Sequence, residues 1–426
     1  MTSQPSLGGI SMDVMECIVT FLDLSEICSL RLVAREVSEK ASQGVFKRHF
    51  RTKKVQLTIK PHLERAISIA QQRRYATLLE HLTLVSLPTS TLGPDSQRGE
   101  HEQGSACLEL LHRALELFCL NSARGCLPTI ALVIEGAGED GPNRPRIWDA
   151  AASCFNITML ALGSSKLPIE ALDIFGSVRC CSLACDQVAA MLAKIDISIL
   201  TESLRGLKQL YMSLAYHERR EPESEYTKSL AFGQANTSAI CRFLELCPAL
   251  RDLQLHWYNT YGSHSEDALT DPLKEEKSFF DRIARSGRFP SLHRCTLKGI
   301  YTSEAALLSF SRQVQHLHHL DMDEIHLGTS GMFRPFFEYL AQDMPELEYL
   351  HLDNLWEERL IYFDAPGKSH FPHSGRRSNG PNTITRTGAD ARKPIRYQFS
   401  HGVALGSPQA SNWARKLRRQ YGPSKY

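Results

Sequence analysis

The feature that most constrains this chain is a recurring pattern of leucines, L-x-x-L-x-L, in which Cys or Met replaces some leucines. Three copies carry a proline two residues before the first leucine, and they span residues 248–255, 290–297 and 345–352. Three other copies lack the proline and span residues 79–84, 207–212 and 317–322. The second and third leucines of each copy alternate inward on a short strand, and the first anchors the turn that enters it. Several copies in one chain therefore predict a repeated strand unit.

Apolar helical segments precede several of these strands, and we expect helices at residues 240–246, 279–283, 307–314 and 336–340. Helix, turn and parallel strand in alternation predict an α/β fold in which strands form one face and helices the other. The spacing resembles irregular leucine-rich repeats, and we expect such a solenoid over residues 55–363. Uneven spacing predicts inserted loops at residues 217–226 and 258–272.

The stretch from residue 55 to 200 predicts more divergent units of the same kind. We expect strands at residues 55–59, 129–135 and 157–161. Residues 86–104 and 136–146 are rich in Gly, Pro and charge, and we expect loops there. The second loop contains G-x-G-x-x-G from Gly136 to Gly141, but Pro142 follows and no helix is expected to begin there, as a dinucleotide site would need. We expect no bound cofactor.

The first 50 residues predict a separate three-helix module after a flexible segment, residues 1–9. Val14, Ile18 and Leu22 form an apolar stripe at helical spacing, and Ser11 occupies the N-cap position. Ser25 is the expected cap of a second helix, and a third is expected through Phe46 and Phe50. A module of this size buries little apolar surface by itself. We therefore expect it to pack against a partner or against the following domain.

This segment, residues 10–50, resembles the F-box. That family's pattern opens with Leu-Pro and a carboxylate, and a Leu-Arg-Leu-Val run follows a polar turn. The matching residues here are Ile10, Asp13, Val14, Met15, Ile18, Leu22, Ile27, Leu30, Arg31, Leu32, Val33 and Arg35. Ser11 stands in place of the proline and Val37 in place of a common tryptophan.

The resemblance implies a non-catalytic substrate receptor of a Skp–cullin–F-box ubiquitin ligase. A Skp-type adaptor, and through it a cullin scaffold, would be the partner of the module. The implied adaptor-binding residues are Ile10, Val14, Met15, Ile18, Leu22, Ile27, Leu30, Leu32 and Val33. Two alternatives stay open, namely helices that only cap the solenoid and a repeat scaffold without a ligase role.

An unknown protein substrate is expected on the strand face or the inserted loops. Residues at outward strand positions are the candidates, namely Gln254, His256, Trp257, Tyr258, Thr296, Lys298, His351 and Asp353. Trp and Tyr are common anchors of protein interfaces. A shift of one residue in the register would turn these side chains inward.

Neither the cysteines nor the histidines predict a metal site. The group Cys180, Cys181 and Cys185 lacks a paired C-x-x-C, and the histidines from His316 to His326 have no cysteine partner. The histidines are expected to face solvent. We find no G-x-S-x-G, HExxH or P-loop motif, so an enzyme is not expected.

Charge divides the chain into an acidic body and a basic tail. From Gly367 to Tyr426 there are 12 Lys or Arg and one acidic residue, a net charge of +11, so the remainder carries −9 of the chain's +2. Residues 364–426 have few aliphatics and predict a disordered tail. Its basic stretch from Trp413 to Arg419 could contact nucleic acid, direct nuclear import or contact the acidic body. No run of apolar residues predicts a membrane span, and Met1 to Gly9 does not resemble a secretory signal, so we expect a cytoplasmic or nuclear protein.

Overall fold

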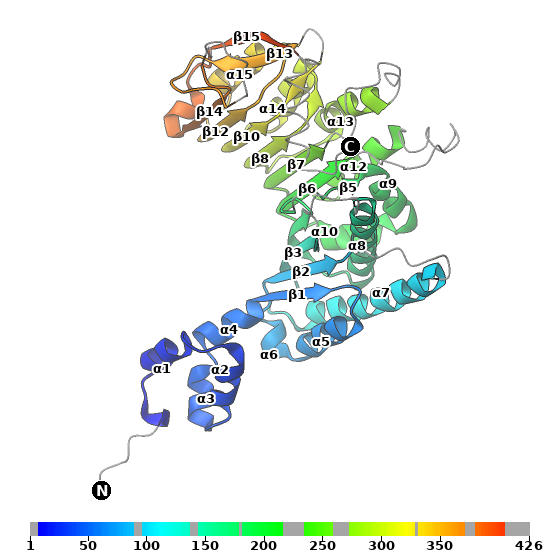
Figure 1. Ribbon diagram of the computed structural model, residues 1–426, viewed down its shortest axis with the longest axis vertical. Coiled ribbons are helices and arrows are strands. Elements are labelled where there is room, and N and C mark those ends of the chain that lie inside the picture. Colours follow the sequence, from blue (N-terminus) through cyan, green and yellow to red (C-terminus); the bar gives the residue numbers. More distant parts are fainter. Residues whose placement is uncertain are drawn as a thin grey trace.

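A computed structural model describes residues 7–88, 96–136, 144–178, 181–215, 234–258, 272–328, 331–370 and 380–404. The chain forms a small helical module followed by an α/β body in which helices and strands alternate (Figure 1). The elements of the module are η1 (Leu7–Gly9), α1 (Met12–Val19), α2 (Leu24–Arg31), α3 (Arg35–Ala41) and α4 (Gly44–Arg51).

The body begins at Thr52 and contains all the strands of the described chain. The elements of its first half are β1 (Thr52–Gln56), α5 (Lys60–Gln71), α6 (Arg73–Ala76), β2 (His81–Ser86), α7 (Ser96–Asn121), β3 (Leu127–Ile134), α8 (Arg144–Ser165), β4 (Ile169–Ile174), β5 (Leu183–Ala184), α9 (Cys185–Lys194) and α10 (Ile197–Leu204). Those of its second half are β6 (Gln209–Ala215), α12 (Gln234–Glu245), β7 (Asp252–Tyr258), α13 (Pro272–Ser286), β8 (Arg294–Lys298), β9 (Tyr301–Thr302), α14 (Glu304–Gln313), β10 (His319–Asp323), β11 (His326–Leu327), α15 (Arg334–Gln342), β12 (Tyr349–Asp353), β13 (Arg359–Phe363), β14 (Thr383–Thr387), η3 (Gly388–Arg392) and β15 (Tyr397–Ala404).

Eleven strands form one curved sheet in the order β1-β2-β3-β4-β6-β7-β8-β10-β12-β14, with β5 beside β6. Successive strands pair in parallel until β14, which pairs antiparallel with β12. Figure 1 shows the helices following the strands along one side of this sheet. The α/β class and the parallel arrangement expected from the leucine pattern are confirmed.

The leucine pattern positions the core as the sequence predicts. Leu253 and Leu255 of β7 align with Cys295 and Leu297 of β8, and these side chains are buried. The residues between them alternate to the opposite face of the sheet. The expected helices are present as α12, α13, α14 and α15.

Four strands end in the same left-handed turn. Phe175, Gly299, Glu324 and Asn354 each follow the last residue of a strand and have a positive φ between 49° and 68°. At Gly299 a Cβ would lie 2.2 Å from the carbonyl oxygen of Trp257, so only glycine fits there.

Several local predictions are wrong. The expected strand at residues 157–161 lies inside the helix α8, and the expected loop at residues 86–104 includes the start of α7. The strand predicted at residues 55–59 begins earlier, at Thr52, and ends at Gln56. The strand at residues 129–135 is confirmed by β3. The loop expected at residues 136–146 ends earlier, because α8 begins at Arg144, so the expectation that no helix begins after Gly141 is also wrong. Most of the two inserted loops, and residues 137–143, lie outside the described residues.

The C-terminal prediction is also wrong for the part that the structure describes. Residues 383–404 form β14, η3 and β15 instead of a disordered tail. β14 continues the main sheet, and β15 pairs antiparallel with β13. Ile384 and Ala391 join the hydrophobic core. The stretch from Trp413 to Arg419 lies outside the described residues.

Candidate functional site

The N-terminal module closes a small core of its own. Its interior consists of Met15, Val19, Ile27, Val37, Ala41 and Phe46. The module has four helices where three were predicted, because the second predicted helix breaks between Arg31 and Arg35. Asp23, and not Ser25 as predicted, caps α2, with a reciprocal pair of hydrogen bonds to Glu26. The predicted cap at Ser11 is confirmed, because its hydroxyl accepts from the N–H of Val14.

An aromatic joint connects the module to the body. The ring of Phe50 on α4 stacks on Tyr75 of α6, with 4.5 Å between the ring centroids. Phe46 packs against both rings, and the guanidinium of Arg31 lies 4.0 Å from the centroid of Phe46. The module therefore leans on the body through α4, while α1 and α2 lie away from it (Figure 1).

The module exposes most of the large apolar side chains that face solvent in the described chain. Eleven large hydrophobic side chains are exposed in the described part of the chain, and seven of them lie within the first 33 residues. We call these seven the N-terminal apolar surface: Leu7, Met12, Val14, Phe21, Leu24, Leu32 and Val33. Leu32 is 88% exposed and Phe21 is 82% exposed. Concentrations of exposed apolar side chains mark sites of interaction, whereas scattered ones are ordinary.

The structure divides the predicted adaptor-binding residues into three groups. Val14, Leu32 and Val33 are exposed, and Ile10, Ile18, Leu22 and Leu30 are partly buried. Met15 and Ile27 are fully buried inside the module, so their assignment to a contact surface is wrong. They lie on the inner faces of α1 and α2, where they form the core on which the outward residues rest.

Phe21, the second most exposed apolar residue of the module, belongs to the apolar stripe of the sequence but is not among the predicted adaptor-binding residues. Val14, Ile18 and Phe21 follow the helical spacing i, i+4, i+7, so the pattern already placed Phe21 beside the predicted residues. Met12 and Leu24, at the starts of α1 and α2, were also missed.

A second candidate surface is the polar face of the sheet. Gln254, Thr296, Asp321 and His351 align across β7, β8, β10 and β12. The next row on the same face consists of His256, Lys298, Asp323 and Asp353. Six of the eight predicted substrate-binding residues therefore lie in two adjacent rows, and we call this the polar strand face.

Not all of these residues are accessible. Gln254, Lys298, His351 and Asp353 are partly exposed, whereas His256 and Thr296 are buried within the face. Trp257 is a core residue that stacks on Phe279 with 4.3 Å between centroids, so its assignment to the outward face is wrong. The side chain of Tyr258 lies outside the described residues.

Two neighbouring carboxyls dominate the electrostatics of the polar strand face. Burial and the adjacent Asp323 raise the pKa of Asp353 to about 7, and burial with Glu324 raises the pKa of Asp323 to about 6. Burial, with Lys298 nearby, lowers the pKa of His256 to about 4. Lys298 lies in the same row, and Nε2 of His370 lies 3.3 Å from Oδ1 of Asp353, so the charge of the row is mixed. Two adjacent carboxyls repel each other when both are ionised, so the row favours a ligand that brings hydrogen-bond donors.

The histidines singled out in the sequence pack against or pair with neighbouring side chains. His316 pairs with Glu346 at 3.1 Å, and His319 stacks on Tyr349. His326 is buried between Tyr301 and Trp356, which corrects the expectation that it faces solvent. Among the residues described, no three His, Cys, Asp or Glu side chains are grouped as metal ligands. Likewise no helix there combines the length and apolar character needed to cross a bilayer.

No protein-family model matches this sequence, and a comparison with curated proteins finds no match. The N-terminal apolar surface and the polar strand face are therefore the features from which a function is proposed.

Proposed function

We propose that this chain is a substrate receptor of a Skp–cullin–F-box ubiquitin ligase. In this proposal the N-terminal module is an F-box and the body is an irregular leucine-rich-repeat solenoid. The N-terminal apolar surface binds a Skp-type adaptor, the body holds a protein substrate, and other subunits carry out the ubiquitin chemistry.

The observation that carries the proposal is the openness of the module's outer apolar face. A helical cap that served only the body would turn its hydrophobic side chains toward the body or into its own core. Here Phe21, Leu32 and Val33 do neither, and they are 82%, 88% and 61% exposed. The Leu-Arg-Leu-Val run of the F-box resemblance ends with the last two of these residues.

The three most exposed of these side chains offset part of the cost of docking, and the partly buried ones beside them must supply the rest. Full burial of a Leu, Val or Phe side chain contributes about 1.5–3 kcal/mol, so three such side chains contribute on the order of 5 kcal/mol. Association costs an amount of similar or larger size. The partly buried Ile18, Leu22 and Leu30 would supply further area at the edges of the contact.

The main rival is a repeat scaffold without a ligase role. One observation favours it: the module encloses Met15, Val19 and Ile27 without help from a partner. A self-contained module could act as a cap for the β1 end of the sheet, which it meets through α4.

Adaptor binding separates these two functions. Purified full-length chain is tested for binding to a Skp-type adaptor, alone and as the double variant Leu32→Asp, Val33→Asp. We expect the double variant to lose affinity by roughly thirtyfold or more, because charged groups replace two central apolar contacts. The matched control is Leu120→Asp, which changes a leucine that is 71% exposed on α7, and it should bind as the wild type does. The proposal would be contradicted if the adaptor did not bind the wild-type chain, or if it bound the double variant with the same affinity.

We also propose the polar strand face as the substrate surface. Its accessible predicted residues are Gln254, Lys298, His351 and Asp353. The paired carboxyls there favour a substrate segment that presents amide or hydroxyl donors.

A further inference from the structure

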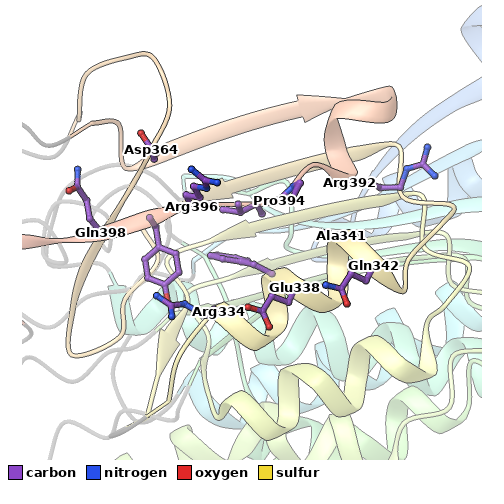
Figure 2. Close-up of a pocket in the computed structure, with 12 residues that line it drawn as sticks. Arg334, Glu338, Ala341, Gln342, Asp364, Arg392, Pro394, Arg396 and Gln398 are labelled. Carbon is purple, nitrogen blue, oxygen red and sulfur yellow. The ribbon is translucent and has the colours of Figure 1, made fainter.

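A groove at the far end of the body carries a different chemistry. It lies between α15 and residues 392–398, the segment that leads into β15, and its volume is about 770 Å³. Figure 2 shows Arg334 and Glu338 on α15 along one side, with Arg392, Pro394 and Arg396 along the other. The volume falls within the range of about 300–1,000 Å³ that is typical of ligand sites. We call it the arginine groove.

The groove has a fixed aromatic floor. Phe337 is buried, and its ring meets that of Tyr397 edge to face, with 5.6 Å between centroids. The hydroxyl of Tyr397 donates to Oε1 of Glu357 at 2.6 Å, which holds the ring in place. Ile395 packs against the core from the same segment. An incoming side chain would therefore meet a preformed apolar base instead of having to order one.

The arginines of the groove have N–H donors that are not used in hydrogen bonds. In the part of the chain that the structure describes, the guanidiniums of Arg334 and Arg396 make no hydrogen bond or ion pair. Arg392 donates one N–H, to the carbonyl oxygen of Pro345 at 2.7 Å. Each guanidinium has five donors in a planar fork that matches a carboxylate or a phosphoryl group.

The surroundings keep the groove positive. Residues 380–404 contain four basic residues and one acidic residue, Asp390. Asp390 is already paired, with Lys393 at 2.7 Å, so it does not neutralise the arginines. Two carboxylates, Glu338 and Asp364, also line the groove, and they leave a net charge of +1 with the three arginines.

We propose that the arginine groove binds a short peptide segment that carries clustered negative charge. The mixed lining distinguishes a peptide from a nucleic acid. A nucleic-acid site follows a continuous phosphate backbone with uninterrupted positive charge, which Glu338 and Asp364 would oppose. A peptide can place its negative side chains at the arginines and its apolar and donor groups at the aromatic floor and the two carboxylates. The negative charge comes from Asp and Glu side chains.

This inference does not depend on the adaptor. The arginine groove and the N-terminal apolar surface lie at opposite ends of the molecule (Figure 1). The groove therefore adds a third interaction site, and its test uses the chain without an adaptor.

The test measures fluorescence anisotropy of labelled peptides with the full-length chain at low and high salt. The probes are a peptide of about ten residues with four aspartates around a tyrosine, the same peptide phosphorylated on the tyrosine, and a lysine-rich counterpart. We expect both acidic peptides to bind, more weakly at high salt, and the lysine-rich peptide not to bind. The unphosphorylated peptide should bind at least as tightly as the phosphorylated one, and binding of the phosphorylated peptide alone would contradict the proposal.

The variant Arg334→Glu, Arg396→Glu should lose at least tenfold in affinity for the acidic peptides. Arg205→Glu, Arg65→Glu makes the same change in net charge away from the groove, and it should bind as the wild type does. Both variants are checked by thermal unfolding. The proposal is overturned if neither acidic peptide binds the wild type, if the two variants lose affinity equally, or if a single-stranded oligonucleotide binds the groove more tightly than the peptides.

Discussion

The two regions of this molecule treat hydrophobic side chains in opposite ways. The body packs leucines between a sheet and a layer of helices, and Leu320, Leu350 and Leu352 are almost completely buried. The module has only four short helices, and it leaves Leu32 and Phe21 almost completely exposed. A layered repeat gains buried area with each added unit, whereas a 40-residue module has too little interior for all of its apolar residues. The difference suggests that the body supplies stability and that the module supplies a contact surface.

The largest expected effect is the loss of stability when a leucine of the body is replaced by alanine, compared with the same replacement in the module. Leu352→Ala should reduce the free energy of unfolding by about 2–5 kcal/mol, because it leaves a cavity between the sheet and its helices. Leu32→Ala should change it by less than about 0.5 kcal/mol, since the side chain is already in water. Chemical denaturation of the two variants measures both values. Similar losses would show that the module's surface is buried in solution.

The turn after β8 should be the next most sensitive position. Gly299→Ala should cost about 2–3 kcal/mol, because the new Cβ would collide with the backbone of Trp257 and the positive φ strains alanine. Gly206→Ala is the control, since a Cβ there meets nothing within 4 Å. Thermal unfolding of both variants measures this difference. An equal loss of stability in the two variants would show that the turn does not require glycine at position 299.

Stability should also depend on the protonation of Asp353. Its pKa is raised to about 7 in the folded state, above the value of about 3.9 in an unfolded chain. Between these values the folded state binds more protons, so stability falls as pH rises from 4 to 7. Asp353→Asn removes this penalty and should stabilise the protein on the order of 1–2 kcal/mol at pH 8, but not at pH 4. Denaturation of both proteins across this pH range measures the effect. Stabilisation by Asp353→Asn at low pH only would contradict the prediction.

The smallest effect concerns the module alone. Asp23→Ala removes the cap of α2 and should cost the module about 1 kcal/mol. Ser25→Ala should cost much less, although the sequence pointed to Ser25 as the cap. Hydrogen exchange of the α1–α4 amides reports on this region separately from the body. Faster exchange in the Ser25 variant than in the Asp23 variant would show that the cap is misassigned.

The repeats could be predicted because their strands alternate with a period of two around a buried core. Leu253, Leu255, Leu350 and Leu352 all fill the positions that the pattern gives them. The error at α8 was avoidable. Ala151, Phe155, Thr158 and Leu162 are buried at helical spacing, and this longer periodicity should have outweighed the β-branched residues near residue 157.

The C-terminal segment could not be predicted in this way. β14 joins the sheet through backbone hydrogen bonds to β12, and these depend little on side-chain identity. Its burial pattern contains a single fully buried residue, Ile384. The arginine groove depends on this segment, because Arg392 and Arg396 meet α15 only after β14 has folded back. The exposed residues of the N-terminal apolar surface were partly predictable, but the helical period alone does not separate the inner face of α1 from its outer face.

The reversed direction of β14 limits the length of this molecule. A further unit of the same kind would have to add a parallel strand beside β12, and β14 already occupies that edge. At the opposite edge, the Phe50–Tyr75 joint holds the helical module next to β1. Elements that do not repeat thus lie at both ends of the array, the antiparallel β14 at one and the helical module at the other. An array that ended in a parallel strand beside β12 could accept another identical unit there, whereas this one cannot.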